Sequence, residues 1–302
     1  MKRVFLLSIA LCAVFTISAQ NTVTVETDAD EIVRLWDNST AKYSNDMSKD
    51  ELLKKKTKLY NTSSAELYIF TPPKEKATGY CMVIYPGGGY THLSIPLSFP
   101  VWCRNNGITA VVVKYRLPNT GHADAMLEDA IGAIEYMRDN AEKYNLDPKK
   151  VGVYGNSAGG HLAAWVSNIL EDEKKPCFAI LVYGAMVRDG MFNRHSTNIL
   201  LGGKDVSASM AETYCTPNLV TETTPPTLLL LSDNDLVVRS TTSTAYYKAL
   251  KRYGVPASMH IYPTGGHGWS GKTKWEYREQ WLGAVKDWIE NLEEYRNRTK
   301  NK

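Results

Sequence analysis

Two hydrophobic patterns alternate along most of the chain. Short unbroken apolar runs, such as Val111-Val112-Val113 and residues 228–231, are typical of strands covered by helices on both faces. Between these runs lie longer segments in which apolar residues recur at three- and four-residue intervals, which gives a helix one buried stripe. The patterns predict strands at 81–85, 109–114, 151–154, 178–183, 227–231 and 257–262, and helices at 99–106, 123–144, 157–170, 241–253 and 275–296.

This alternation predicts an α/β fold with a mostly parallel central sheet flanked by helices on both faces. The sequence has no linker rich in proline, glycine or serine, no repeat and no low-complexity run. We therefore expect residues 20–302 to form one domain. Residues 185–225 are the longest stretch without clear alternation, and we expect them to form a cap or a pocket insertion.

The N-terminal part of this domain has a weaker pattern. Residues 20–55 are polar and charged, and they predict an irregular arm with one short helix at 49–55. Residues 56–60 and 66–70 have strand character and are separated by Asn61-Thr62-Ser63-Ser64, a sequence typical of a turn. These two runs predict an antiparallel hairpin at a sheet edge.

The first residues predict an export signal. Lys2 and Arg3 precede an apolar run at 4–17, and the small residues Ser18-Ala19 follow it. The apolar run has signal-peptide length and is short for a membrane span, so residues 1–19 are interpreted as a signal peptide. An N-terminal membrane anchor is the alternative. The expected location is secreted or periplasmic, with no membrane association after cleavage.

Composition narrows the possible partners. The net charge is only +3 over 302 residues, and no basic patch is interleaved with aromatic residues, so nucleic acid is not an expected partner. The cysteines beyond the signal are widely spaced, which is not a disulfide framework, although a disulfide among them stays open. No pair has metal-ligand spacing, and there is no His-Glu-x-x-His motif, so a metal is not expected. These cysteines are Cys81, Cys103, Cys177 and Cys215.

A candidate nucleophile lies in Gly155-Asn156-Ser157-Ala158-Gly159, between a predicted strand and a predicted helix. This Gly-x-Ser-x-Gly pattern is typical of a nucleophile elbow. A serine on so sharp a turn has strained backbone geometry, and flanking glycines leave room for it. The turn lifts the hydroxyl above the sheet edge.

A serine hydroxyl needs a base to take its proton and an acid to orient that base. After a nucleophile elbow, the acid and then the histidine follow along the chain. Asp235 comes just after the predicted strand at 227–231, and His267 follows the last predicted strand between glycines. Asp233 is the alternative acid, although we interpret it as a turn residue.

The remaining histidines have no expected catalytic role. His161 is expected to support the turn of the elbow, and His260 alternates along a strand. His92, His122 and His195 lie in predicted loops or at element ends. Of these, His92 and His195 are candidates for the substrate pocket, together with Tyr90 and Trp269.

The loop Pro86-Gly87-Gly88-Gly89-Tyr90 follows the predicted strand at 81–85. Consecutive glycines expose backbone N–H groups and allow a substrate oxygen to come close. Gly88 and Gly89, together with the amide of Ala158, are therefore the candidate oxyanion hole. A phosphate-binding turn is disfavoured because no Lys-Ser/Thr pair follows the glycines.

These motifs resemble the α/β-hydrolase superfamily, and more narrowly its secreted carbohydrate-esterase branch of acetylxylan esterases and feruloyl esterase-like proteins. The resemblance is carried by residues 85–90, 114–118, 155–163 and 265–268. It implies a triad of Ser157, His267 and Asp235, no cofactor, and de-esterification of plant polysaccharide. Arg116 and Asp129 also match, and we interpret them as a structural pair. The chain departs from the pattern at 93–98, at Asn156 and at Arg239.

The sequence thus predicts a serine esterase that acts on an acylated carbohydrate through an acyl-enzyme. An acetyl ester of xylan-type carbohydrate is the expected substrate, and a feruloyl ester is the alternative. A small peptidase of the prolyl-oligopeptidase type is disfavoured, because those relatives carry a large extra domain. A non-enzymatic binding module would require a broken triad. The choice between polymer and oligosaccharide, and the oligomeric state, stay open.

Overall fold

A computed structural model describes residues 21–187, 190–203 and 212–300. The expected signal peptide at 1–19 therefore lies outside the described residues. No helix within the described part of the chain combines the length and apolar character that crossing a membrane requires.

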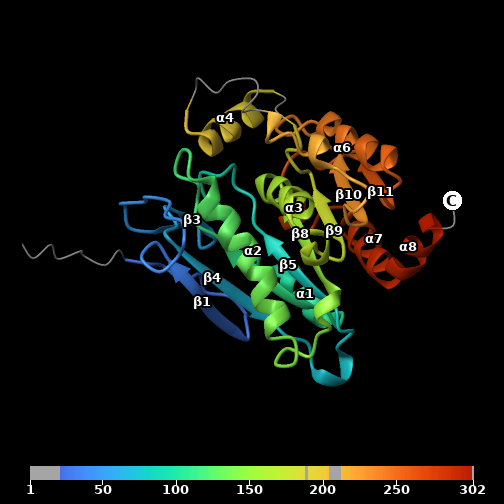
Figure 1. The fold of residues 1–302 in the computed structure, drawn as a ribbon, viewed down its shortest axis with the longest axis horizontal. Coiled ribbons are helices and arrows are strands. Elements are labelled where there is room, and N and C mark those ends of the chain that lie inside the picture. Colours follow the sequence, from blue (N-terminus) through green and yellow to red (C-terminus); the bar gives the residue numbers. More distant parts are fainter. Residues whose placement is uncertain (1–20, 188–189, 204–211, 301–302) are drawn as a thin grey trace, which may run out of the picture.

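An eight-stranded sheet forms the centre of the molecule (Figure 1). The pairings at its β1 end are antiparallel, and those from β7 through β11 are parallel. The mostly parallel sheet expected from the alternation is confirmed. Across the sheet the strands are β1 (Glu31–Asp37), β4 (Ser64–Phe70), β7 (Thr109–Lys114), β5 (Cys81–Tyr85), β8 (Val151–Asn156), β9 (Ala179–Val182), β10 (Thr227–Ser232) and β11 (Ala257–Tyr262).

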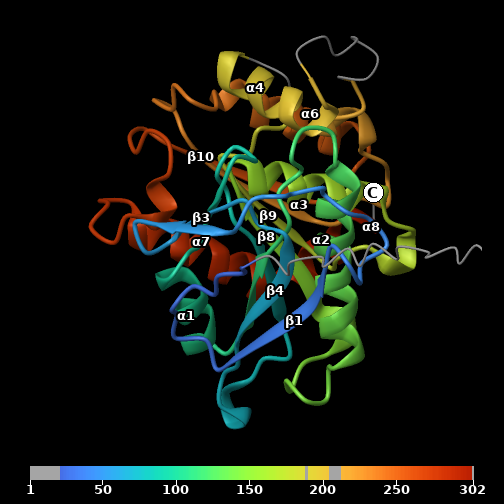
Figure 2. The same cartoon turned by 90° about the vertical axis from the view of Figure 1, so that its left-hand side faces the viewer.

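Helices cover both faces of the sheet, as the unbroken apolar strands require. In Figure 2, α1 (Ser98–Asn105) and α7 (Arg278–Glu290) lie on one side of the strands, and α2 (Ala123–Asp139) and α3 (Ala158–Ile169) lie on the other. Next to α3 lies α6 (Ser240–Arg252), whose Tyr246 hydroxyl accepts a hydrogen bond of 2.9 Å from Asn168. The predicted helix at 275–296 is divided at Asn291, which separates α7 from α8 (Leu292–Lys300).

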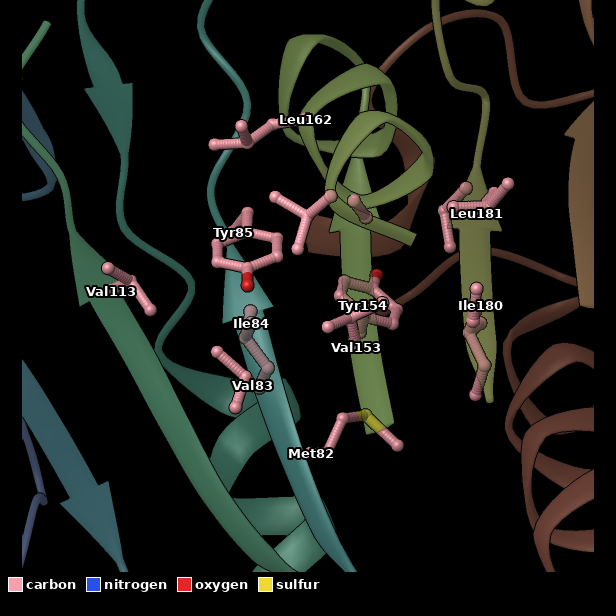
Figure 3. Packing of buried hydrophobic residues seen from close by; sticks show 14 of the residues in the cluster. Met82, Val83, Ile84, Tyr85, Val113, Val153, Tyr154, Leu162, Ile180 and Leu181 are labelled. Carbon is pink, nitrogen blue, oxygen red and sulfur yellow. The ribbon is translucent and has the colours of Figure 1, made fainter. Parts of the chain in front are cut away.

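The interior is filled from the strands that carry the site. Figure 3 shows side chains of β5, β7, β8 and β9 packing together with Leu162 of α3. All five residues of β5 and all four of β9 are buried. Burying an apolar side chain of this size stabilises a fold by about 1.5–3 kcal/mol, so the strand ends that bear the loops of the site are firmly held.

The N-terminal region differs from its prediction. Instead of an irregular arm with a helix at 49–55, it contains β1 and β2 (Leu52–Lys54). The prediction of a hairpin between 56–60 and 66–70 is also wrong. β3 (Lys58–Tyr60) pairs with β2 and with β6 (Leu93–Ser94) in a separate three-stranded sheet, whereas β4 pairs with β1 and β7.

A buried carboxylate explains this arrangement. Glu51 accepts hydrogen bonds from the backbone amides of Ser63 and Ser64 at 3.0 and 3.3 Å, so these residues do not close a turn. Its other oxygen lies 2.7 Å from the Lys114 ammonium on β7, whose side chain is 0% exposed. Glu51 thereby fixes the start of β2 against the main sheet.

Arg116 and Asp129 form the predicted structural pair. Both are completely buried, and the guanidinium of Arg116 contacts the carboxylate of Asp129 at 2.7 Å. Burial raises the pKa of Asp129, and the hydrogen bonds from Arg116 oppose that shift. The pair connects the segment after β7 to α2, away from the cavity described below.

The segment at 185–225 contributes α4 (Gly190–Leu201) and a short 3-10 helix, η4 (Thr216–Leu219), within its described residues. The carbonyl of Ile199 in α4 accepts a 2.8 Å hydrogen bond from the amide of Gly121, in the loop before α2. The hydroxyl of Ser196 contacts the Gly89 carbonyl at 3.5 Å. The segment thus packs beside the glycine loop.

Candidate active site

Ser157 stands at the junction of β8 and α3 in a strained backbone conformation, with φ 56° and ψ −122°. The glycines on either side are required by close contacts. A Cβ atom at Gly155 would lie 2.0 Å from the Gly159 carbonyl oxygen, and one at Gly159 would lie 2.0 Å from the Tyr85 carbonyl oxygen. Any larger residue would push α3 away from the sheet, so the motif fixes the position of the serine.

The structure brings Ser157, His267 and Asp235 into one hydrogen-bonded row. The Oγ atom of Ser157 lies 2.8 Å from His267 Nε2, and His267 Nδ1 lies 2.7 Å from Asp235 Oδ2. Because a carboxylate only accepts, the Nδ1–H group donates to Asp235 and Nε2 is left to accept the serine proton. The side chain of Asp235 is 1% exposed and that of His267 is 20% exposed.

Asp235 is held on both of its oxygens. Its Oδ1 atom accepts hydrogen bonds from the backbone amides of Val237 and Val238 at 2.8 and 2.9 Å. Its other oxygen is thereby directed at His267. Asp233, the alternative acid, is exposed two residues earlier.

Two side chains next to Asp235 hold the loop that carries His267. Asn234 accepts a 2.8 Å hydrogen bond from the Gly266 amide, and Ser232 donates one of 2.6 Å to the Gly266 carbonyl. Sequence reasoning missed both residues. Their position at the end of a predicted strand, beside the candidate acid, is the signal that could have identified them.

The glycine loop lies against the elbow. A Cβ atom at Gly87 would lie 2.6 Å from the Asn156 carbonyl oxygen. At Gly88, where φ is +141°, it would lie 1.9 Å from the His92 carbonyl oxygen. Neither position has room for a side chain, so the loop backbone approaches Ser157 closely.

Hydrogen bonds within the loop occupy its carbonyl groups. The Gly87 carbonyl accepts from the Ser94 amide at 2.8 Å, and the Gly88 carbonyl accepts from the Thr91 amide at 3.2 Å. Among the described residues, none accepts a hydrogen bond from the amides of Gly88 or Gly89. These amides are therefore available to a ligand oxygen.

Tyr90 connects the glycine loop to α3, the helix that follows Ser157, on the buried side of the loop. Its hydroxyl lies 2.8 Å from the Ala158 carbonyl oxygen and 2.7 Å from His161 Nδ1. The other ring nitrogen of His161 donates to the Tyr214 carbonyl at 2.9 Å. Burial lowers the pKa of His161 to about 4, so its ring is neutral at pH 7. His161 thus supports the elbow, as expected from the sequence.

A cavity of about 730 Å³ opens over Ser157 and His267. Of the four predicted pocket residues, only His92 is among the described residues that line it. Tyr90 is 3% exposed and faces the interior, and Trp269 is 0% exposed within an aromatic cluster behind the histidine loop. His195 is exposed on α4 and is not part of the described lining.

Tyr183 is a lining residue that the sequence did not indicate. The edge of its ring packs on His267, with 4.8 Å between the ring centroids, and its hydroxyl is hydrogen-bonded to Ser270. Burial raises the pKa of Tyr183 to about 12, so the hydroxyl keeps its proton. Its φ of 38° is unusual for a residue with a side chain, which makes its position hard to infer from pattern alone.

The small sheet and the turn before β3 supply another part of the lining, through Lys58 and Ser94 of the sheet and Thr57 of the turn. His92 stacks on Tyr60 beside it, with ring centroids 5.0 Å apart. Burial and the nearby Lys58 ammonium lower the pKa of His92. The sequence placed this region at a sheet edge and gave no indication that it would border the cavity.

The thiols lie away from this chemistry. Cys81, Cys103 and Cys177 are buried and form no disulfide, and burial raises the pKa of Cys177 to about 12. Within the described residues, no group of three or more histidine, cysteine, aspartate or glutamate side chains is arranged to hold a metal ion.

Comparison with known families identifies the architecture. A family model described as the α/β hydrolase fold matches residues 82–271, which include Ser157, Asp235 and His267. The chain belongs to this family. Within an α/β hydrolase, the strand-end positions of these three residues agree with the chain order of a nucleophile elbow, an acid and a histidine.

Individual relatives of this α/β hydrolase include a named esterase and a named xylanase. An acetylxylan esterase of Xylanibacter ruminicola is 32% identical over 241 residues, covering 78% of this chain and 50% of the relative. An endo-1,4-beta-xylanase B of Butyrivibrio fibrisolvens is 28% identical over 62% of this chain and 32% of its own length. The chain thus spans half of the first relative and about a third of the second.

A solved structure, an acetyl ester-xyloside bifunctional hydrolase from Caldicellulosiruptor lactoaceticus, superposes with a TM-score of 0.72 at 29% identity. The match covers 88% of this chain and 97% of that one. A thermophilic esterase from Thermogutta terrifontis, at 23% identity and a TM-score of 0.63, shares the fold.

Proposed function

We propose that this chain is a serine esterase that removes acetyl groups from xylan-type carbohydrate through an acyl-enzyme. The observation that carries the proposal is the row Ser157–His267–Asp235, with its Oγ–Nε2 and Nδ1–Oδ2 distances of 2.8 and 2.7 Å, at the floor of an open cavity. The three groups have the geometry that acyl transfer requires without any rearrangement.

In the first half of the reaction, Ser157 Oγ attacks the ester carbonyl carbon while His267 Nε2 takes the hydroxyl proton. The carbonyl oxygen becomes an oxyanion, which the amides of Gly88, Gly89 and Ala158 stabilise. One such donor contributes about 3 kcal/mol to lowering the barrier. The bond between the acyl carbon and the sugar oxygen then breaks, and His267 donates its proton to the departing sugar oxygen, which leaves as a hydroxyl group.

In the second half, His267 takes a proton from water, and the resulting hydroxide attacks the acyl-serine. Collapse of the second tetrahedral intermediate releases the carboxylic acid and regenerates the Ser157 hydroxyl. Asp235 keeps the imidazole oriented and stabilises its positive charge in both halves.

The choice of an acetylated carbohydrate is supported by the relatives, since one is named an acetylxylan esterase and a solved neighbour an acetyl ester-xyloside bifunctional hydrolase. The cavity volume of about 730 Å³ suits a ligand with several sugar rings better than a small free ester. Apolar lining residues such as Ile95, Leu97 and Phe99 would also accept an aromatic acyl group, so a feruloyl ester is the competing substrate.

Two assays test the proposal. Ser157→Ala is expected to lower hydrolysis of p-nitrophenyl acetate by more than about a thousand-fold and to abolish labelling by a fluorophosphonate. Ser258→Ala, near the opposite end of β11, serves as the matched control and should keep both. Retention of substantial activity in Ser157→Ala would refute the assignment of the nucleophile.

The acyl group is tested by incubating the purified protein with acetylated xylan and, separately, with methyl ferulate. We expect free acetate from the first and little ferulate from the second. Release of ferulate alone would contradict the acetyl assignment while leaving the serine esterase mechanism in place.

We also infer that the protein is exported, on the basis of Lys2, Arg3 and the apolar run at 4–17. Fractionation of the producing cells, with N-terminal sequencing of the recovered protein, tests this inference. A mature chain that begins near Gln20 outside the cytoplasm is the expected result, and an intact Met1 on a cytoplasmic protein would overturn it.

A further inference from the structure

A lysine-rich hairpin forms part of the cavity wall. β2 and β3 pair in antiparallel register, with Lys54 directly opposite Lys58. Lys58 and the preceding Thr57 line the cavity that contains Ser157. Since directly opposite residues share one face of a sheet, Lys54 lies on the same face as Lys58. Lys58 is thus part of the cavity wall, and a second lysine lies opposite it on the hairpin.

This hairpin carries local costs. Its turn includes Lys55 and Lys56, whose φ angles of 50° and 63° fall in the left-handed region that side chains disfavour. Like charges directly opposite each other in a sheet are also unfavourable. Glu51, immediately before β2, nevertheless holds the hairpin in place through its buried contact with Lys114. Local costs that the surrounding structure maintains are typical of functional sites.

The positive charges have no acidic counterpart in the described structure. No aspartate or glutamate is among the described residues that line the cavity. Among the described residues, neither Lys54 nor Lys58 forms an ion pair with a carboxylate, and Glu51, the acidic residue next to the hairpin, contacts Lys114 instead, at 2.7 Å. An ammonium group in a cavity wall without a partner is available to an anionic ligand.

An aromatic surface adjoins these charges. Tyr60 follows Lys58 by two positions on β3, so it lies on the same face, and its ring stacks on His92. The Lys54 ammonium lies 5.1 Å from the centroid of the Tyr60 ring. Aromatic rings beside a few well-placed polar groups are the usual composition of a site for a ring-shaped polar ligand.

We propose that the lysine hairpin, residues 52–60, is a subsite for a carboxylate-bearing sugar unit of the acylated carbohydrate. Lys58 binds the carboxylate, Lys54 adds positive charge, and the Tyr60–His92 pair contacts the sugar ring. The proposal rests on the proposed function, since it assigns to the same site a preference for uronic-acid-substituted chains. It adds a specificity determinant that the catalytic row does not supply.

The test compares two substrates that differ in one group. Acetylated xylo-oligosaccharides with and without a glucuronic acid side unit are hydrolysed in parallel, and the ratio of their kcat/KM values is measured. We expect the wild-type enzyme to favour the acidic substrate by about ten-fold, the size expected for one charge-assisted contact. Because salt screens such contacts, the ratio should fall as NaCl is raised.

Variants assign the effect to the hairpin. Lys58→Gln should reduce the ratio to near one, Lys58→Glu should favour the neutral substrate, and Lys58→Arg should retain the preference. Lys248→Gln, an exposed lysine on α6, is the matched control and should change nothing. Thermal unfolding of each variant verifies that it is folded.

Failure of this proposal is distinguishable from failure of the proposed function. If the wild-type protein hydrolyses p-nitrophenyl acetate but treats both oligosaccharides alike, or if Lys58→Gln keeps the preference, the subsite is refuted and the esterase stands. Calorimetric binding of a deacetylated glucuronic-acid-substituted xylo-oligosaccharide needs no turnover. Wild-type binding at least ten-fold tighter than that of Lys58→Gln supports the subsite even for an inactive protein, and equal binding overturns it.

Discussion

The two sides of the cavity differ in whether their charged side chains have partners within the protein. On the side that carries Ser157, here called the catalytic side, the ionisable side chains are engaged by other protein groups: Asp235 by the amides of Val237 and Val238, and His267 by Asp235 and Ser157. On the hairpin side, Lys58 faces Lys54 and has no carboxylate partner among the described residues.

This difference indicates that one side of the cavity positions the reacting groups and the other side recognises the carbohydrate. Polar groups that satisfy one another are held rigidly, which is what acyl transfer requires of a nucleophile, a base and an orienting acid. Charges that lack a partner within the protein can instead bind an oppositely charged ligand. Changes on the catalytic side should therefore affect every ester, whereas changes on the hairpin side should affect only the choice of carbohydrate.

The sharpest test of the catalytic side is Asp235→Asn. An asparagine amide cannot hold His267 in the tautomer that accepts the serine proton, so we expect kcat/KM for p-nitrophenyl acetate to fall by about 10⁴-fold. Asp233→Asn is the matched control, because it changes an exposed carboxylate two residues away, and it should leave kcat/KM nearly unchanged. The reverse pattern would show that Asp233 is the acid.

The glycine loop should give the next largest effect. In Gly88→Ala, the new methyl group would lie 1.9 Å from the His92 carbonyl oxygen, so the loop must move and its amides leave the oxyanion position. Loss of one donor lowers kcat by about 10²–10³-fold. The loss should appear in kcat more than in KM, as stopped-flow and steady-state assays can measure.

Gly254→Ala is its control. Gly254 also has a positive φ, of 69°, but nothing lies within 4 Å of the added methyl group. It should lose some stability and keep its kcat. Equal effects of both substitutions on kcat would mean that backbone strain, and not the oxyanion position, accounts for the loss at Gly88.

The catalytic side was also the side that the sequence predicted best. The Gly-x-Ser-x-Gly pattern at 155–159 and the apolar run at 228–231 are local signals, because each can be recognised within a few consecutive residues. The predicted strands at 81–85, 109–114 and 257–262 have the same bounds in the structure. The family match over 82–271 spans the same part of the chain.

The hairpin side was missed because it depends on partners far away in the sequence. β1 pairs with β4 about thirty residues later, from Glu31 opposite Ile69 to Asp37 opposite Ser64. Glu51 is fixed by Lys114, and no local pattern indicates that contact. Four closely spaced lysines at 54–58 resemble a solvated loop until the fold places them beside a cavity.

His161 links the catalytic side to the stability of the whole fold. Its pKa of about 4 lies below the 6.5 of an exposed histidine, so between these values the unfolded chain binds a proton that the native chain does not. The free energy of unfolding should therefore decline as pH falls from about 6.5, and by pH 4 it should be about 3 kcal/mol lower.

Denaturant unfolding at several pH values measures this decline for the wild type and for His161→Gln. The variant is expected to show a flatter dependence between pH 6.5 and 4, because it has no such proton to bind. Parallel curves for the two proteins would mean that His161 does not remain neutral in the folded state.

The smallest predicted effect concerns the strain of the hairpin itself. Lys56 has a φ of 63°, a conformation that costs a side-chain-bearing residue about 1–2 kcal/mol and costs glycine almost nothing. After allowing for the greater freedom of glycine in the unfolded chain, Lys56→Gly should raise the free energy of unfolding by about 0.5 kcal/mol. Lys248→Gly, in the interior of α6, should lower it by about 1 kcal/mol.

Opposite signs for these two lysine-to-glycine changes, measured by denaturant midpoints, would show that the turn retains lysine at a cost in stability. Lys56 itself is not among the described residues that line the cavity, so the preference for an acidic oligosaccharide should survive the change. A stabilised variant that still prefers the acidic oligosaccharide would show that Lys56 contributes backbone strain but no substrate recognition, as expected if Lys58 binds the carboxylate. A destabilised Lys56→Gly would instead show that the turn is not strained. Backbone strain would then no longer support a functional role for the hairpin. The role of Lys58 in binding a carboxylate rests on its charge, which the oligosaccharide assay tests separately.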